Sequence, residues 1–203
     1  MARKEPQVDH AERSSPDDSG KVCGVRLLLV GLRSPINVGM ILRVAETYRA
    51  PVATLDCDAV LGNATNIATV SDFACGALQR FGFTRLGAFE DLRQWLKGSR
   101  LIATTIAKAA VRLPDFTFTS GDVIAFGSEY DGLDERVLSR ADSLVTIPMA
   151  DVWTPKPKSS RPIDPARASP PSNDGRPNLN VAISVGIVCY TAFIGGVRAT
   201  QGC

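Results

Sequence analysis

Apolar residues along this chain follow two alternating patterns. Short runs of consecutive apolar residues, such as residues 25–30, are typical of buried parallel strands. Between these runs lie segments in which apolar residues recur three or four positions apart, which is the spacing of one helix face. The first is residues 37–49, with apolar side chains at Val38, Ile41 and Leu42. The chain is therefore predicted to alternate strands with helices.

The two patterns predict nine elements. Strands are expected at 25–30, 52–55, 100–105, 122–126 and 143–147, and helices at 37–49, 86–97, 134–140 and 179–197. Such an order predicts an α/β fold with a mostly parallel sheet that is covered on both faces.

The domain organisation follows from where the patterns stop. Residues 1–22 are polar, mixed in charge and almost free of large apolar side chains, so we expect a disordered tail there. Residues 23–203 are expected to form one domain. Residues 150–177 interrupt that domain with seven prolines, a density that no packed element tolerates, and are predicted to be a long flexible loop.

The composition of the chain says more about its cellular compartment than about its binding partners. The formal net charge of +2 says little about binding partners, and the 44% hydrophobic content is enough for a globular core. No apolar leader is present near the start, and the longest apolar stretch, 181–197, is interrupted and short of the roughly 20 residues of a membrane span. The five cysteines form no C-x-x-C pair and are expected to be reduced. We therefore predict a cytoplasmic protein without a membrane partner.

The single histidine excludes several classes of enzyme. His10 lies in the polar tail, so a hydrolase built on a Ser-His or Cys-His pair is not expected. Zinc sites based on histidine are equally disfavoured, no cysteine spacing compensates, and no metal is expected. Neither G-x-G-x-x-G nor G-x-x-x-x-G-K-[ST] is present, so the common dinucleotide and P-loop sites are not supported either.

Three polar segments are candidates for chemistry. Asn37 and Arg43 lie near the start of the first helix, Glu129 follows the apolar strand 122–126, and Asn180 opens the apolar C-terminal helix. Open α/β sheets bind ligands at the carboxyl ends of their strands, which is where such residues gather. Each segment alone fits a plainer interpretation equally well: a helix cap, a solvated arginine or a polar turn.

Together, the order and spacing of these segments resemble the SpoU (TrmH-like) branch of the SPOUT methyltransferase superfamily. The matching positions are Asn37, Gly39 and Arg43 for N-x-G-x-x-x-R, then Gly127, Glu129, Gly132, Leu133 and Ile147-Pro148-Met149, then Asn178-Leu179-Asn180-Val181-Ala182. The resemblance covers roughly residues 25–197, nearly all of the chain that is expected to be ordered.

The resemblance implies a fold, a cofactor and a substrate. The fold would contain a C-terminal deep trefoil knot, a rare exception to the rule that chains do not knot. The cofactor would be S-adenosyl-L-methionine, bound mainly by backbone contacts, and the product a ribose 2′-O-methyl group on tRNA or rRNA. Members of the family are usually homodimers whose sites are completed across the interface. The cofactor-binding positions would be Ala103 or Thr104, Gly127, Ile147 and Leu179.

The same resemblance implies that Arg43, Asn37, Glu129 and Asn180 are catalytic. The family proposal makes Arg43 the base that manages the proton of the ribose hydroxyl. Arginine is normally fixed in its charged form, so positioning the phosphate beside the target ribose fits its chemistry better. Asn37, Glu129 and Asn180 would orient Arg43 and the reacting groups.

Two departures from the family pattern leave alternatives open. Asn178 and Ala182 stand where the family usually has serine, and loop 150–177 lengthens a connection that is short in compact relatives. The loop contains five basic residues against three acidic ones, which suits either an RNA contact or a solvated linker. A non-catalytic RNA-binding protein of the same fold and a base-methylating SPOUT enzyme are the competing hypotheses.

Overall fold

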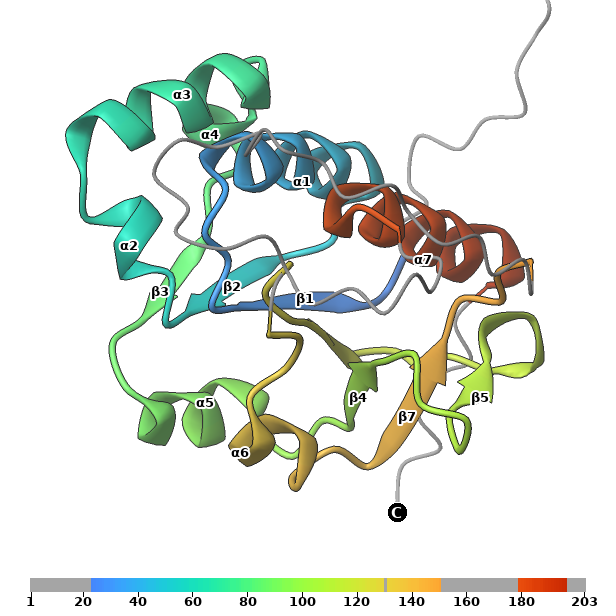
Figure 1. Ribbon diagram of the computed structural model, residues 1–203. Coiled ribbons are helices and arrows are strands. Elements are labelled where there is room, and N and C mark those ends of the chain that lie inside the picture. Colours follow the sequence, from blue (N-terminus) through green and yellow to red (C-terminus); the bar gives the residue numbers. More distant parts are fainter. Residues whose placement is uncertain (1–22, 130, 151–178, 197–203) are drawn as a thin grey trace, which may run out of the picture.

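The computed structural model describes residues 23–129, 131–150 and 179–196. The predicted tail and all of the proline-rich loop except Ala150 lie outside these residues. The described chain forms one seven-stranded sheet in the order β3-β2-β1-β6-β4-β7-β5 (Figure 1). The strands are β1 (Arg26–Val30), β2 (Val52–Leu55), β3 (Thr84–Leu86), β4 (Leu101–Thr104), β5 (Val111–Arg112), β6 (Val123–Phe126) and β7 (Ser143–Thr146).

Helices separate most of these strands along the chain. They are α1 (Pro35–Tyr48), α2 (Asp58–Leu61), α3 (Ala64–Ala74), α4 (Ala77–Arg80), α5 (Phe89–Leu96), the 3-10 turn η1 (Leu113–Asp115), α6 (Glu135–Leu138) and α7 (Val181–Gly195). Each pairing within the sheet is parallel. The predicted α/β class with a mostly parallel sheet is confirmed.

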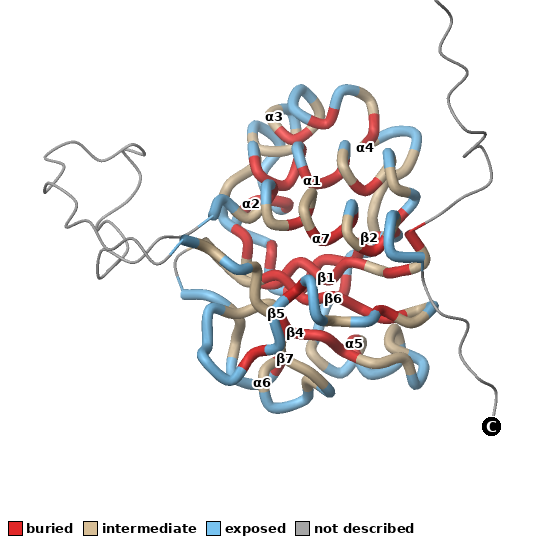
Figure 2. The backbone as a smooth tube through the Cα atoms, turned by 90° about the vertical axis from the view of Figure 1, so that its right-hand side faces the viewer, coloured by how far each residue is buried: buried red, intermediate tan, exposed pale blue. Residues whose placement is uncertain are grey.

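The sheet is covered on both faces, as predicted (Figures 1 and 2). Strand side chains alternate between two cores because successive Cβ atoms point to opposite faces. Leu27 and Leu29 of β1 pack with α1, α3, α4 and α7, whereas Leu28 and Val30 pack with α5 and α6. The apolar run of β1 is therefore buried on both sides, as its lack of alternation predicts.

A topological switch point lies between β1 and β6. These strands are neighbours, but the chain leaves β1 toward β2 and β3 on one side, while β4, β7 and β5 lie on the other side of β6. Connections that leave in opposite directions open a crevice at the carboxyl ends of the strands. The candidate residues after β1 and β6 therefore meet at one edge.

The structure contains elements that were not predicted from the sequence, namely β3, β5, η1 and the three helices α2, α3 and α4. The predicted helix 86–97 is observed as α5 with a later start, and Leu86 is instead the last residue of β3. The helix begins only at Phe89 because the Asp91 carboxylate accepts hydrogen bonds from the backbone N–H groups of Gly87 and Ala88, both at 2.9 Å. Residues 58–80, for which no element was predicted, form three helices. The Asn63 side chain caps the longest of them, α3.

The apolar C-terminal helix α7 is part of this globular fold. One side of it packs into the core through Val185, Val188 and Ala192. Among the helices that the structure describes, none combines the length and the hydropathy that a membrane crossing requires.

Candidate active site

Asn37 occupies the first turn of α1 at the carboxyl edge of the sheet. The Ser34 hydroxyl caps this helix by accepting a hydrogen bond from the Asn37 backbone N–H at 3.3 Å, and Pro35 fits the first helical position, where no N–H donor is needed. The Asn37 side chain is 7% exposed, so its amide needs partners inside the protein.

Asn37 connects the three segments that the sequence had singled out. Its Nδ2 donates to Glu129 Oε1 at 2.5 Å, and its Oδ1 accepts from Asn180 Nδ2 at 3.0 Å. These residues follow β1, follow β6 and cap α7, respectively. We call Asn37, Glu129 and Asn180 the polar triad.

The chemistry of the partners fixes the direction of these hydrogen bonds. A carboxylate only accepts, so the Asn37 amide must turn its NH₂ group toward Glu129 and its oxygen toward Asn180. Asn180 Oδ1 is already occupied, because it accepts from the Ala182 backbone N–H at 2.8 Å to cap α7. Its NH₂ group is therefore the part that faces Asn37. The triad has one self-consistent orientation.

The loop after β6 holds Glu129 in place. The backbones of Ser128 and Gly132 exchange two hydrogen bonds of 2.9 and 3.0 Å, which close the loop. Gly127 is required at its base, because a Cβ there would overlap the backbone of Gly132 and Leu133. Glu129 Oε2 also accepts from the Arg33 backbone N–H at 3.4 Å. The glycines of the second segment thus shape the loop that presents the carboxylate.

Arg43 does not join the triad. It is exposed on α1, and its Nη1 lies 3.4 Å from Cys75 Sγ at the end of α3. Six residues along a helix correspond to about 600°, so Arg43 points about 120° away from Asn37. Arg43 therefore does not reach the triad of its own chain from this side of α1. Its catalytic role stays a prediction.

The predicted cofactor positions lie along the same edge of the sheet. Thr104 is the last residue of β4, Gly127 follows β6 and Ile147 follows β7, and these three strands are adjacent. Leu179 precedes the Asn180 cap and is 37% exposed. Ala103 is fully buried inside β4, so of the paired candidates Thr104 is the one that reaches the edge. The Thr104 hydroxyl donates to the Ala125 carbonyl oxygen at 2.8 Å.

Asn178 and Ala182, the two positions of the third motif where the family usually has serine, differ in what the structure shows of them. Asn178 lies outside the described residues. The Ala182 side chain is buried in the core beside α1, and only its backbone N–H takes part in the site, through the cap by Asn180. Alanine at this position is therefore explained by packing.

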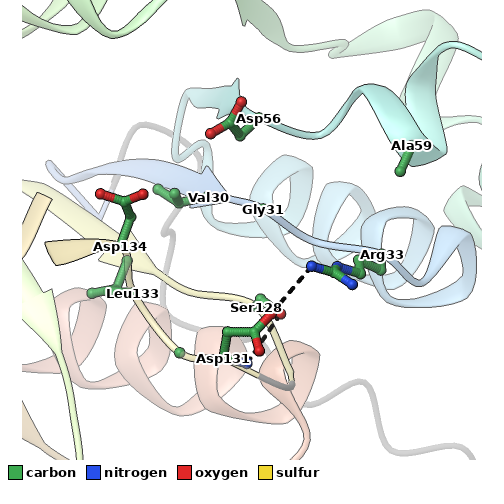
Figure 3. A pocket seen from close by; sticks show the side chains of 10 residues that line it. Val30, Gly31, Arg33, Asp56, Ala59, Ser128, Asp131, Leu133 and Asp134 are labelled. Carbon is green, nitrogen blue, oxygen red and sulfur yellow. Dashed lines mark hydrogen bonds and ion pairs between the residues drawn. The ribbon is translucent and has the colours of Figure 1, made fainter. Parts of the chain in front are cut away.

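A pocket of about 350 Å³ lies beside the loop that carries Glu129 (Figure 3). Its lining comes from the ends of β1 and β2, from α2 and from the loop after β6: Val30, Gly31, Arg33, Asp56, Ala59, Ser128, Asp131, Gly132, Leu133 and Asp134. Beside it lies Cys57, whose pKa burial raises to about 11, so this thiol is protonated and provides no nucleophile. Within the described ranges, no group of three or more His, Cys, Asp or Glu residues could hold a metal ion.

Sequence reasoning missed two residues that position the triad. Ser34 caps α1 and Arg33 binds Glu129 through its backbone. The pair Ser34-Pro35 could have been recognised as the start of the helix, since serine at the cap followed by proline is a standard start signal. The Arg33 contact uses a backbone group, for which no side-chain pattern exists. Among the described residues, Cys23, Cys57, Cys75 and Cys189 are free thiols.

Comparison with known proteins decides the family. The model of the SpoU rRNA Methylase family matches residues 24–153, a span that contains all seven strands and two members of the triad. The chain belongs to the SpoU rRNA Methylase family. Asn180 lies beyond the matched span, yet the structure places it against Asn37.

Two individual proteins are also similar in sequence to this SpoU member. The chain is 28% identical over 82% of its length to 23S rRNA (guanosine-2′-O-)-methyltransferase RlmB of Nitrosomonas europaea, and 33% identical over 62% to an uncharacterized tRNA/rRNA methyltransferase of Synechocystis. It spans 55% and 32% of the lengths of these relatives.

A solved structure supports the fold. The SpoU methyltransferase AviRb from Streptomyces viridochromogenes, in complex with the cofactor AdoMet, matches with a TM-score of 0.60 and 22% identity over 83% of this chain and 56% of that one. At this identity the match supports only the fold of the present chain. The chemistry has to be argued from the residues of its own site.

Proposed function

We propose that this protein transfers a methyl group from S-adenosyl-L-methionine to a ribose 2′-hydroxyl of tRNA or rRNA. The observation on which this rests is the polar triad, which assembles three distant segments at the carboxyl edge of the sheet in a chain of the SpoU family. The 2′-O-methyltransferase name of the RlmB relative points to the same reaction.

The residues at the ends of β4, β6 and β7 fit S-adenosyl-L-methionine. They offer a run of backbone groups together with the apolar side chains of Ile147 and Leu179, which suits an adenosine ring and a thioether chain. The hydroxyl of Thr104 is already bonded to Ala125, so backbone contacts and apolar packing would hold the cofactor. The bound cofactor supplies a methyl group on a positively charged sulfur. We further propose that the C-terminal part of the fold contains the deep trefoil knot that the resemblance to the SpoU family implies.

The protein residues act mainly by positioning. The triad would hold the ribose hydroxyl in line with the methyl group, and alignment of two reacting groups removes much of the barrier to a bimolecular step. Glu129 presents a carboxylate whose two oxygens contact Asn37 and Arg33, so its geometry is fixed before RNA arrives. Arg43 would bind the phosphate next to the target ribose.

We propose that the protein is a homodimer in which the partner completes the site. Helices α1 and α7 pack side by side (Figure 1), and both carry apolar side chains that are exposed to solvent. The exposed residues are Ile36 and Met40 on α1 and Ile183, Tyr190 and Ile194 on α7. Arg43 follows Ile36 and Met40 on the same helical stripe. An interface across this face would bring Arg43 to its edge, where it can reach a site on the other subunit.

Calorimetric titration with S-adenosyl-L-methionine, followed by transfer of a labelled methyl group to RNA, tests the proposal. We expect binding to one site per subunit and label in tRNA or rRNA transcripts. Binding of RNA without binding of the methyl donor at millimolar concentration would instead support the non-catalytic RNA-binding alternative. An RNA substrate agrees with the cytoplasmic location that the sequence predicts.

A further inference from the structure

The pocket beside the triad has a lining that selects for a particular chemistry. Three of its side chains are carboxylates, Asp56, Asp131 and Asp134, against one guanidinium, Arg33. We propose that this pocket binds an unstacked RNA base that carries an exocyclic amino group, namely cytosine, adenine or guanine in preference to uracil. This inference rests on the proposed function, since it names the base that accompanies the reacting ribose.

The position of the pocket supports a base next to the reacting ribose. Ser128 and Asp131, which line the pocket, flank Glu129 in one closed loop. Arg33 contacts both the triad and the pocket lining. Its backbone N–H donates to Glu129, and its guanidinium lies 3.2 Å from Asp131 (Figure 3). A ribose at the triad therefore has its base, or that of the adjacent nucleotide, within reach of the pocket.

The charge of the pocket disfavours phosphate and favours hydrogen-bond donors. Arg136 bridges Asp56 and Asp134, with nitrogen–oxygen distances of 3.5 and 3.0 Å, so these two carboxylates lie close together. The hydrogen bond from Arg136 lowers the pKa of Asp134, which keeps this group ionised at neutral pH. A carboxylate has about four acceptor positions, so each retains free ones after pairing with an arginine.

Base edges differ in what they offer to such acceptors. The amino groups of cytosine, adenine and guanine donate hydrogen bonds, and carboxylates are known acceptors for the cytosine N4 group. Uracil has no amino group, and it presents a carbonyl oxygen where cytosine and adenine carry theirs, which a carboxylate repels. RNA-binding proteins read unstacked bases through hydrogen bonds to these edges.

The shape of the pocket also fits a base. Its volume of about 350 Å³ lies at the lower end of the range for small-molecule pockets, about 300–1,000 Å³. Val30, Ala59 and Leu133 provide apolar surface for the face of a ring, while Asp56 and Asp134 lie on either side of Val30 (Figure 3). Asp56 has φ 55°, a conformation that asparagine also tolerates, so an isosteric substitution leaves the backbone intact.

The test compares the binding of three fluorescein-labelled RNA hexamers, oligo-C, oligo-A and oligo-U, by fluorescence anisotropy. The wild-type protein should bind oligo-C and oligo-A about tenfold more tightly than oligo-U. Asp56→Asn should reduce that ratio to less than about threefold, because a neutral amide discriminates less between donor and acceptor. Asp134→Asn, which keeps a helix-capping oxygen for α6, should act in the same direction.

Asp115→Asn is the matched control, since it removes the same charge from an exposed side chain outside the pocket. It should change the affinity for all three hexamers equally and leave their ratio unchanged. Equal binding of the three RNAs by the wild-type protein, no binding at millimolar RNA, or an unchanged ratio in both pocket variants would overturn the proposal. The assay needs no methyl transfer, so the two proposals can fail separately. A base preference without methylation would reject only the proposed enzyme activity, and methylation without a base preference would reject only the proposed role of the pocket.

Discussion

Asn37 performs two tasks with one side chain, and its neighbours permit a single orientation. Its amide donates to Glu129 and accepts from Asn180, whose other side-chain atom caps α7. The helix cap and the site therefore share Asn180. Two of the plain interpretations left open by the sequence hold for members of the triad, because Asn180 is a helix cap and Glu129 lies in a turn. Asn37 is not a cap, since Ser34 caps α1.

The substitution Asn180→Asp separates these two tasks. The variant would still cap α7, since aspartate is as good a cap as asparagine, but its side chain would turn an oxygen toward Asn37 Oδ1 in place of a donor. We expect stability within about 1 kcal/mol of wild type and a loss of methyl transfer on the order of 100-fold, because a displaced positioning group is costly. Thermal unfolding and initial rates with labelled donor measure both quantities.

Asn63→Asp provides the control for this variant. Asn63 caps α3 through its side chain, at a position that touches no member of the triad. Its methyl-transfer rate should equal that of wild type. If Asn180→Asp were as active as this control, the triad would have no role in positioning.

Thr54 on β2 provides a prediction about stability alone. Its hydroxyl is buried and has no hydrogen-bond partner among the described residues. Thr54→Val keeps the shape and removes the unsatisfied group, which should stabilise the fold by about 1 kcal/mol. Denaturant unfolding measures the change, and a loss of stability would show that the hydroxyl has a partner after all.

At the scale of elements, α1 is fixed by its close contact with α3. A Cβ added at Gly39 would lie 2.6 Å from the Val70 carbonyl oxygen and 2.8 Å from the Phe73 Cβ. The glycine of the first motif therefore permits helix packing, while the asparagine two residues earlier serves the site. Motif membership alone does not distinguish these two reasons.

Gly39→Ala should accordingly destabilise the protein by about 1–3 kcal/mol, the usual cost of overpacking. Gly186→Ala in α7 is the matched control, because a Cβ there meets nothing within 4 Å. That change should be neutral or stabilising by up to about 1 kcal/mol, owing to the helix propensity of alanine. In urea unfolding, the midpoint of Gly39→Ala should fall below that of wild type, while the midpoint of Gly186→Ala should stay the same or rise.

Elements with strong periodicity could be predicted from the sequence, and those without it could not. β2 was predicted at its observed bounds, and α7 within two residues at either end. Strand β5 has two residues and no pattern of its own, so only its pairing with β7 creates it. The segment after β2 lacks a continuous apolar stripe, and packing of α3 against α1 stabilises its helices.

The site was predictable as a set of residues, but its geometry was not. Three widely separated residues were identified from the order of the motifs, and the structure joins Asn37, Glu129 and Asn180. The position of Arg43 depends on the rotation of a helix relative to its neighbours, which the spacing within a motif does not specify. The pocket arises from four segments that meet only in the folded chain.

At the scale of the whole molecule, the exposed apolar face of α1 and α7 predicts self-association. Tyr190 and Ile194 are 54% and 56% exposed on α7, and contiguous exposed apolar surface usually marks an interface. A charge on this face should weaken the dimer strongly, because it would be buried without a partner. The double variant Tyr190→Asp, Ile194→Asp should sediment as a monomer where the wild type sediments as a dimer.

Ile106→Asp serves as the control for that measurement, since Ile106 is an exposed apolar residue in the connection after β4 and belongs to neither helix. It should remain dimeric in the ultracentrifuge. A wild-type protein that is monomeric at micromolar concentration, or a double variant that stays dimeric, would contradict an interface on α1 and α7.

The most direct test of the central claim is the identity of the methylated nucleoside. Unmodified tRNA and rRNA transcripts would be incubated with the protein and isotopically labelled S-adenosyl-L-methionine, digested to nucleosides and analysed by mass spectrometry. We predict a 2′-O-methylated nucleoside whose label resides on the ribose, and the loss of this product in Asn180→Asp. Label on a base, or no labelled nucleoside from a protein that binds the donor, would contradict this prediction.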